Sequence, residues 1–124
     1  MHDGWEMARE RPRREYAEPR IYVSLNRRGE IAMNDEAFRQ IGRPASVTLL
    51  YHREISCIGV KFPVSADGNF FPVRQYGRGG RMSIVRAARM LKQFGIKVDK
   101  TIVFDCVVVE QYKGHPMLLL ELDE

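Results

Sequence analysis

The sequence predicts a mainly β fold of the α+β class with short helices, built from two β-β-α-β-β units. Three observations lead to this prediction: apolar residues alternate along several short runs, turn residues separate these runs, and the order of elements before residue 62 returns after residue 70. Repeated units of this kind bury their apolar faces against each other. We therefore expect one compact domain over 20–124, internally duplicated as 20–62 and 70–124 with a linker at 63–69.

Composition fits a soluble globular protein. The chain has 124 residues, of which 44% are hydrophobic and 29% charged. Its longest apolar runs are far shorter than the roughly 18 residues of a membrane-spanning helix, and its N-terminus lacks the apolar segment of a secretory signal. These features predict a cytoplasmic protein that does not contact a membrane.

Residues 1–19 are predicted to form a flexible N-terminal arm. The run from Arg9 to Glu15 is rich in charge and poor in apolar residues, and Pro12 and Pro19 interrupt it. A segment with so little apolar surface does not gain enough from burial to become ordered.

The first unit begins with a predicted hairpin. Ile21, Val23 and Leu25 alternate with polar residues as in a half-buried strand, 26–29 forms a turn, and a second strand follows over 30–33.

A short helix and a second hairpin complete this unit. Asn34 is a favourable N-cap, the next two residues place negative charge in the first turn, and Gly42 with Pro44 ends the helix. Strands are then predicted over 46–52 and 55–62, joined by a tight connection at 53–54.

The second unit is predicted to begin with a strand over 70–74, in which Pro72 indicates an edge or a bulge. Residues 77–81 form a flexible glycine-rich connection. Ser83 is a candidate cap for an amphipathic helix that runs to Phe94, has a basic outer face and ends at Gly95.

Two strands, 101–111 and 116–122, are predicted to end the chain around a turn at 113–114. The first is apolar at nearly every position from 102 to 109, which predicts a central strand covered on both faces. Cys57 and Cys106 lie in apolar runs without metal-type spacing, so we expect reduced, buried thiols.

The run from Arg27 to Asn34, followed by Glu36 to Gly42, resembles the swapped-hairpin domain of the AbrB, MazE and MraZ superfamily. A weaker copy spans 70–123. The resemblance implies a prokaryotic protein in which two tandem units form one interlaced, swapped-hairpin-like barrel. It also implies an AbrB-like role in transcription regulation through DNA binding, since members are mostly dimeric regulators or antitoxins.

The charge distribution is consistent with a DNA-binding surface. Between residues 63 and 100 the chain has eight basic and two acidic residues, and five of the eight are arginine. Guanidinium groups contact phosphates and read guanine edges in duplex DNA. An ordinary solvated face is the alternative. The predicted DNA-binding residues are Arg27, Arg28, Arg39, Arg74, Arg78, Arg81, Arg86 and Arg89.

The sequence contains no pattern typical of an enzyme, a metal site or a cofactor site. His2, His52 and His115 lack neighbouring ligands or a nucleophile, and the 77–80 segment lacks the Gly-Lys-Ser/Thr ending of a phosphate loop. We therefore expect no catalytic activity and no cofactor.

The rival hypothesis is a protein-interaction module of antitoxin-like or adaptor type. In this case the basic helix binds an acidic protein partner. Alternatively, it pairs with the acidic C-terminal residues of a second copy to form a homodimer.

Overall fold

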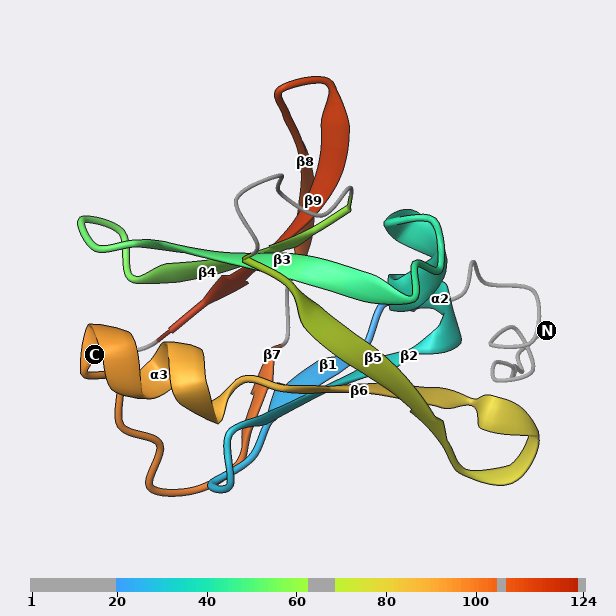
Figure 1. Ribbon diagram of the computed structural model, residues 1–124, viewed down its shortest axis with the longest axis horizontal. Coiled ribbons are helices and arrows are strands. Elements are labelled where there is room, and N and C mark those ends of the chain that lie inside the picture. The colour runs from blue at the N-terminus through green and yellow to red at the C-terminus, as the bar shows by residue number, and fades with distance from the viewer. Residues whose placement is uncertain (1–19, 63–68, 105–106, 123–124) are drawn as a thin grey trace, which may run out of the picture.

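The computed structural model describes residues 20–62, 69–104 and 107–122. In this part of the chain nine strands form one curled, antiparallel half-barrel sheet in the order β7-β1-β2-β6-β5-β3-β4-β9-β8 (Figure 1). The strands are β1 (Val23–Leu25), β2 (Glu30–Asn34), β3 (Ser46–His52), β4 (Cys57–Lys61), β5 (Phe71–Tyr76), β6 (Met82–Arg86), β7 (Ile102–Phe104), β8 (Val108–Tyr112) and β9 (His115–Glu121). The helices are α2 (Asp35–Gln40), α3 (Ala88–Phe94) and the 3-10 turn η2 (Arg78–Gly80). The predicted mainly β class with short helices is confirmed.

The predicted arm and most of the predicted linker, at 1–19 and 63–68, lie outside the described residues, as does Cys106. Among the helices of the described residues, none is long and apolar enough to cross a membrane.

The first hairpin and its helix follow the sequence prediction. Asn26 closes the β1–β2 turn because its side-chain oxygen accepts hydrogen bonds from the backbone N–H groups of Arg28 and Glu30, each at 3.0 Å. Asn34 caps α2 by accepting from the Ala37 N–H at 2.9 Å. The predicted cap is confirmed, and the side chain of the capping residue supplies one of the acceptors that the helix start lacks.

The next hairpin differs in its connection. β3 and β4 pair from Thr48↔Lys61 to His52↔Cys57, so the turn covers 53–56 instead of the two residues predicted. Ser56, at φ 50°, is the left-handed residue that allows this longer turn.

The predicted helix from Ser83 is wrong at its first half. Residues 82–86 form strand β6, which lies between β2 and β5, and α3 begins only at Ala88. Ser83 does not cap a helix; its hydroxyl accepts a 3.0 Å hydrogen bond from the Gln75 amide on β5. Two neighbouring strands supply backbone partners along β6, and this pairing outweighs the local helical pattern. Gly95 ends α3 at φ 67°, as predicted.

The predicted central strand over 101–111 is also wrong. Its described residues are divided mainly between β7 and β8, which form the two opposite edges of the sheet. Val103 is 46% exposed and Val108 47% exposed, so this apolar run is not covered on both faces. The turn at 113–114 and the last strand agree with the prediction.

The short connection between β7 and β8 requires the sheet to curl. The Cα atoms of Phe104 and Val108 are four residues apart and therefore separated by at most about 15 Å. Nine strands in a flat sheet would span about 38 Å. The two edges consequently approach each other, and Figure 1 shows β3 and β4 in one layer and β1, β2 and β6 in another, with β5 running from the first layer to the second.

Strand pairing mixes the two halves of the chain. β2 pairs with β6 from Glu30↔Arg86 to Asn34↔Met82, and β4 pairs with β9 from Cys57↔Glu121 to Lys61↔Met117. Apolar side chains from both halves join one buried cluster, whose members include Val23, Leu25, Ile31, Met33, Leu49, Ile58, Val60, Val85, Leu118 and Leu120.

Candidate nucleic-acid interface

The β5–β6 hairpin is a basic ribbon. The segment 71–86 has four arginines, Arg74, Arg78, Arg81 and Arg86, and no aspartate or glutamate. Its strands pair from Val73↔Val85 to Tyr76↔Met82, and Figure 1 shows the hairpin extending away from the rest of the molecule to its tip at η2. The tip glycines at 77, 79 and 80 have φ values of 85°, 71° and 65°, a backbone that other residues rarely adopt.

Successive side chains of the ribbon point alternately to an inner and an outer face. Ser83 and Val85 are buried, so Ile84 and Arg86 point to the outer face, and Arg74 lies beside Ile84 in the register. Tyr76 lies on this outer face with 45% of its surface exposed. We call the outward residues Arg74, Tyr76, Ile84 and Arg86 the basic face.

The cations of the basic ribbon are not neutralised within the described residues. Arg74, Arg78 and Arg81 have no ion-pair partner there. Arg81 does share a shallow hollow with Asp35 and Glu36 at the start of α2. Two carboxylates therefore lie near the tip of the ribbon.

The β1–β2 turn places Arg27 and Arg28 beside the end of β6. The Gly29 carbonyl accepts a 2.7 Å hydrogen bond from the Ala87 N–H, and a Cβ on Gly29 would lie 2.9 Å from the Ala88 Cα. Only glycine allows so close an approach, so this contact fixes the turn against the β6–α3 junction.

One carboxylate lies among these cations. Glu30 is opposite Arg86 in the register, and its Oε1 lies 3.2 Å from Nη2 of Arg28. The hydrogen bond from Asn26 and the charges of Arg28 and Arg86 hold the pKa of Glu30 below its usual value. Arg28 is thus partly compensated, whereas Arg27 has no ion-pair partner in the described part of the chain.

The other two predicted arginines lie elsewhere. Arg39 on α2 donates through Nε and Nη2 to the Glu36 carboxylate, which lowers the pKa of Glu36. Arg89 on α3 lies over the ring of Phe71, an inward residue of β5, and so faces away from Arg74. The structure brings together Arg27, Arg28, Arg74 and Arg86 and places Arg78 and Arg81 at the tip of the same hairpin, but it separates Arg39 and Arg89.

Sequence reasoning missed Tyr76 and Ile84, which lie between the arginines of the basic face. Burial alternates with period two over 82–86, but the sequence does not show it, because Ser83 is buried while Met82 and Ile84 are only partly buried. Treating this segment as helical hid the face that it forms.

A second surface lies on the outside of β4, β9 and β8. An apolar groove of about 340 Å³ has a floor that includes Leu50, Cys57, Gly59, Met117 and Leu119. We call this surface the apolar groove.

Negative charge borders the apolar groove. Glu110 lines it, and burial followed by the charges of Glu121 and Glu110 raises the pKa of the Cys57 thiol. Cys57 is free and buried, so its predicted burial is confirmed.

Neither the search for a metal site nor the comparisons with known proteins indicate a function. Within the residues that the structure describes, no three His, Cys, Asp or Glu side chains are grouped so that they could hold a metal ion. Scans with protein-family models and searches of curated proteins and of solved structures found no match to this chain.

Proposed function

We propose that this protein is a small DNA-binding protein of the transcription-regulator type, which binds duplex DNA through the basic ribbon and the adjacent β1–β2 turn. The observation that carries the proposal is a projecting hairpin with four arginines and no carboxylate. A two-stranded ribbon fits the major groove of B-DNA, and guanidinium groups suit both phosphates and guanine edges. Arg27 and Arg28, on the adjacent turn, would extend the contact with DNA along its phosphate backbone.

We further propose that the two halves are related units of an interlaced, AbrB-like swapped-hairpin barrel. Both halves contain a hairpin, a short helix and a second hairpin, in this order. Pairing of β2 with β6 and of β4 with β9 is the exchange that interlacing requires. The second half departs from the first by the additional strand β7.

The decisive experiment compares two variants with equal charge change. The ribbon variant replaces Arg74, Arg78, Arg81 and Arg86 with Gln, and the control replaces four exposed lysines outside the ribbon, Lys92, Lys97, Lys100 and Lys113, with Gln. Fluorescence anisotropy with a labelled random duplex measures affinity from 50 to 200 mM salt. Four phosphate contacts give a slope of log affinity on log salt of about −3.6, which the ribbon variant should lose.

Wild-type protein should lose about a hundredfold in affinity over this salt range, and the control should keep most of the slope. Equal losses in the two variants would show a generic cationic effect and remove the ribbon from the proposal. Absence of duplex binding at 50 mM salt would remove the proposal itself.

The apolar groove favours a second candidate function, a protein-interaction module that forms a homodimer. Val108 at the neighbouring edge strand and Ile55 beside the groove are 47% and 54% exposed. Exposed apolar surface next to an open strand edge is typical of association sites. Light scattering with and without DNA tests this candidate: a dimer that forms regardless of DNA supports the module.

A further inference from the structure

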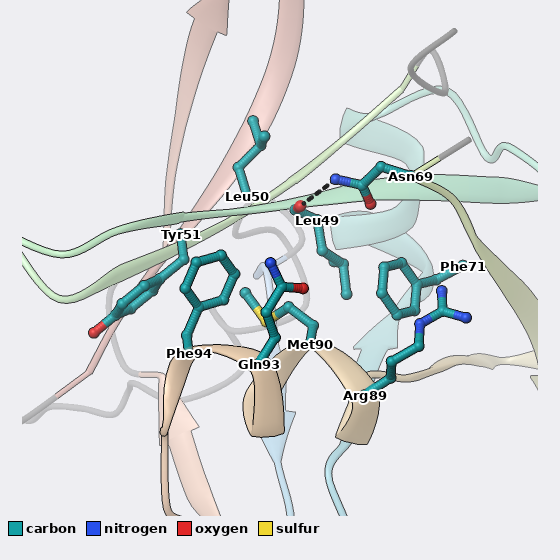
Figure 2. A pocket seen from close by; sticks show the side chains of 9 residues that line it. All are labelled: Leu49, Leu50, Tyr51, Asn69, Phe71, Arg89, Met90, Gln93 and Phe94. Carbon is teal, nitrogen blue, oxygen red and sulfur yellow. Dashed lines mark hydrogen bonds between the residues drawn. The ribbon is translucent and has the colours of Figure 1, made fainter. Parts of the chain in front are cut away.

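A cleft between α3 and β3 has the composition of a small-molecule site. It encloses about 530 Å³, within the usual size range of ligand pockets (Figure 2). Leu49 and Met90, each 2% exposed, form apolar surface at its base. Phe71 and Phe94 stand on either side in Figure 2, so the cleft has aromatic surface at both ends.

Arg89 gives the cleft a positively charged group held in place. Its guanidinium carbon lies 4.4 Å from the centre of the Phe71 ring, and its Nη2 donates a 3.2 Å hydrogen bond to the Phe70 carbonyl. One of five N–H donors is used, which leaves the others for an anion. Among the described residues that line the cleft, none carries a carboxylate. A fixed guanidinium without a nearby carboxylate favours a phosphate or carboxylate group.

Gln93 supplies a group that recognises the edge of a ring. Figure 2 shows its amide between Phe94 and Phe71, directed toward β3. It makes no hydrogen bond to any residue in the described ranges. A primary amide both donates and accepts, and glutamine uses both groups to recognise the edge of adenine.

Phe94 is itself held in position. Its ring lies 5.2 Å from that of Tyr51, and the guanidinium of Arg53 lies 5.4 Å from its centre. These contacts limit the motion of the wall against which a planar ligand would pack, so less order has to be gained on binding.

We propose that this cleft binds a planar heteroaromatic ring that carries an anionic group, the chemistry of a nucleoside monophosphate. Arg89 holds the anion, Phe94 and Met90 pack against the ring, and Gln93 hydrogen-bonds to its edge. The ligand is either a free nucleotide or an unpaired nucleotide of a single strand. This site is separate from the basic face, since Arg89 lies on the other side of β5 from Arg74.

The test is an amide NMR titration of the full chain with four probes: adenosine monophosphate, adenosine, inorganic phosphate and a short oligodeoxyadenylate. We expect the monophosphate to shift α3 and β3 signals with a dissociation constant below about 1 mM, and adenosine and phosphate to bind at least about tenfold more weakly. If only the monophosphate shifts these signals, the source is a free nucleotide. If the oligonucleotide shifts the same signals at lower concentration, the source is a single strand.

Variants connect the shifts to the cleft. Arg89→Met and Gln93→Leu should each weaken the monophosphate about tenfold or more, while Lys92→Met, which removes a charge from α3 outside the cleft, should not. The ribbon variant should bind the monophosphate as the wild type does, so a failure of DNA binding and a failure of this site are distinguishable. Circular dichroism checks that each variant is folded.

The proposal is overturned if the monophosphate causes no saturable shift at about 5 mM, far above the expected dissociation constant. It is also overturned if adenosine or phosphate alone binds equally well, or if both cleft variants are folded and keep wild-type affinity.

Discussion

The two outer surfaces of the sheet differ in chemistry although one continuous sheet forms both. The basic face on β5 and β6 combines arginines with Tyr76 and Ile84, whereas the apolar groove on β4, β9 and β8 is lined by Met117 and Leu119 and bordered by Glu110. Both surfaces lie opposite the same core. Burial in the core requires only the inward-facing, alternate residues of a strand to be apolar. The outward-facing residues can therefore differ between strands and serve separate functions.

The largest effect is expected when one carboxylate is placed in the middle of each surface. Ile84→Glu introduces a negative charge next to Arg74, and we expect about a hundredfold loss of duplex affinity because the carboxylate both neutralises the arginine and repels phosphate. Leu119→Glu should leave duplex affinity unchanged and abolish any homodimer. Anisotropy and light scattering measure the two effects. Equal loss of DNA binding in both variants would contradict the division into two surfaces.

Two glycines with similar backbone angles are expected to differ in how much their substitution destabilises the fold. Gly29 and Gly42 have φ values of 85° and 87°, but a Cβ at Gly42 meets nothing within 4 Å, whereas at Gly29 it meets the Ala88 backbone. Gly42→Ala should cost about 1 kcal/mol for backbone strain. Gly29→Ala should cost about 2–4 kcal/mol because the clash is added to the same strain.

Urea unfolding measures both glycine variants. Gly29→Ala should also weaken duplex binding, since it displaces the turn that carries Arg27 and Arg28 from the end of β6. Equal stability of the two variants would show that the turn can move away from α3 without loss.

The smallest expected effect concerns pH and the two arginines paired with carboxylates of α2, Arg39 on the helix and Arg43 beyond its end. Arg43 and Arg39 lower the pKa values of Asp35 and Glu36, from ordinary values of 3.8 and 4.5. A carboxyl whose pKa is lowered by folding stabilises the fold above its unfolded pKa and loses this contribution as the pH falls through the folded value. Stability should therefore decline slightly below about pH 4.5.

Thermal unfolding between pH 6 and pH 3 measures this decline. Arg39→Gln should make the decline smaller, because it removes the donor that holds the Glu36 carboxylate ionised. Arg78→Gln at the hairpin tip should leave the profile as it is. An identical effect of both substitutions would mean that the tip is coupled to the α2 carboxylates.

The first half of the chain could be predicted well because its signals are local. Asn34 as a cap, the turn over 26–29 and the alternation in 46–52 each depend on residues close in sequence. The second half contains two segments whose structure depends on distant partners. Ser83 is compatible with a helix start and with a strand. It lies in a strand because β6 pairs with β2 on one side and with β5 on the other.

The candidate site was predictable in residue type but not in grouping. An arginine-rich segment is visible in the sequence, yet the register that places Arg86 opposite Glu30 and the packing that turns Arg89 toward Phe71 are tertiary. Whether two arginines share a face depends on strand or helix periodicity, and the incorrect helix over 83–87 changed that assignment.

The sheet order has a consequence for synthesis on the ribosome. β1 pairs with β7 on one side, and β4 pairs with β9 on one side. Neither strand of the N-terminal half can complete its pairing until residues from Ile102 onward have been synthesised. A nascent chain that stops earlier exposes two unpaired strand edges, which can pair with other chains. Synthesis of β7 and then of β9 is thus what covers the two edges.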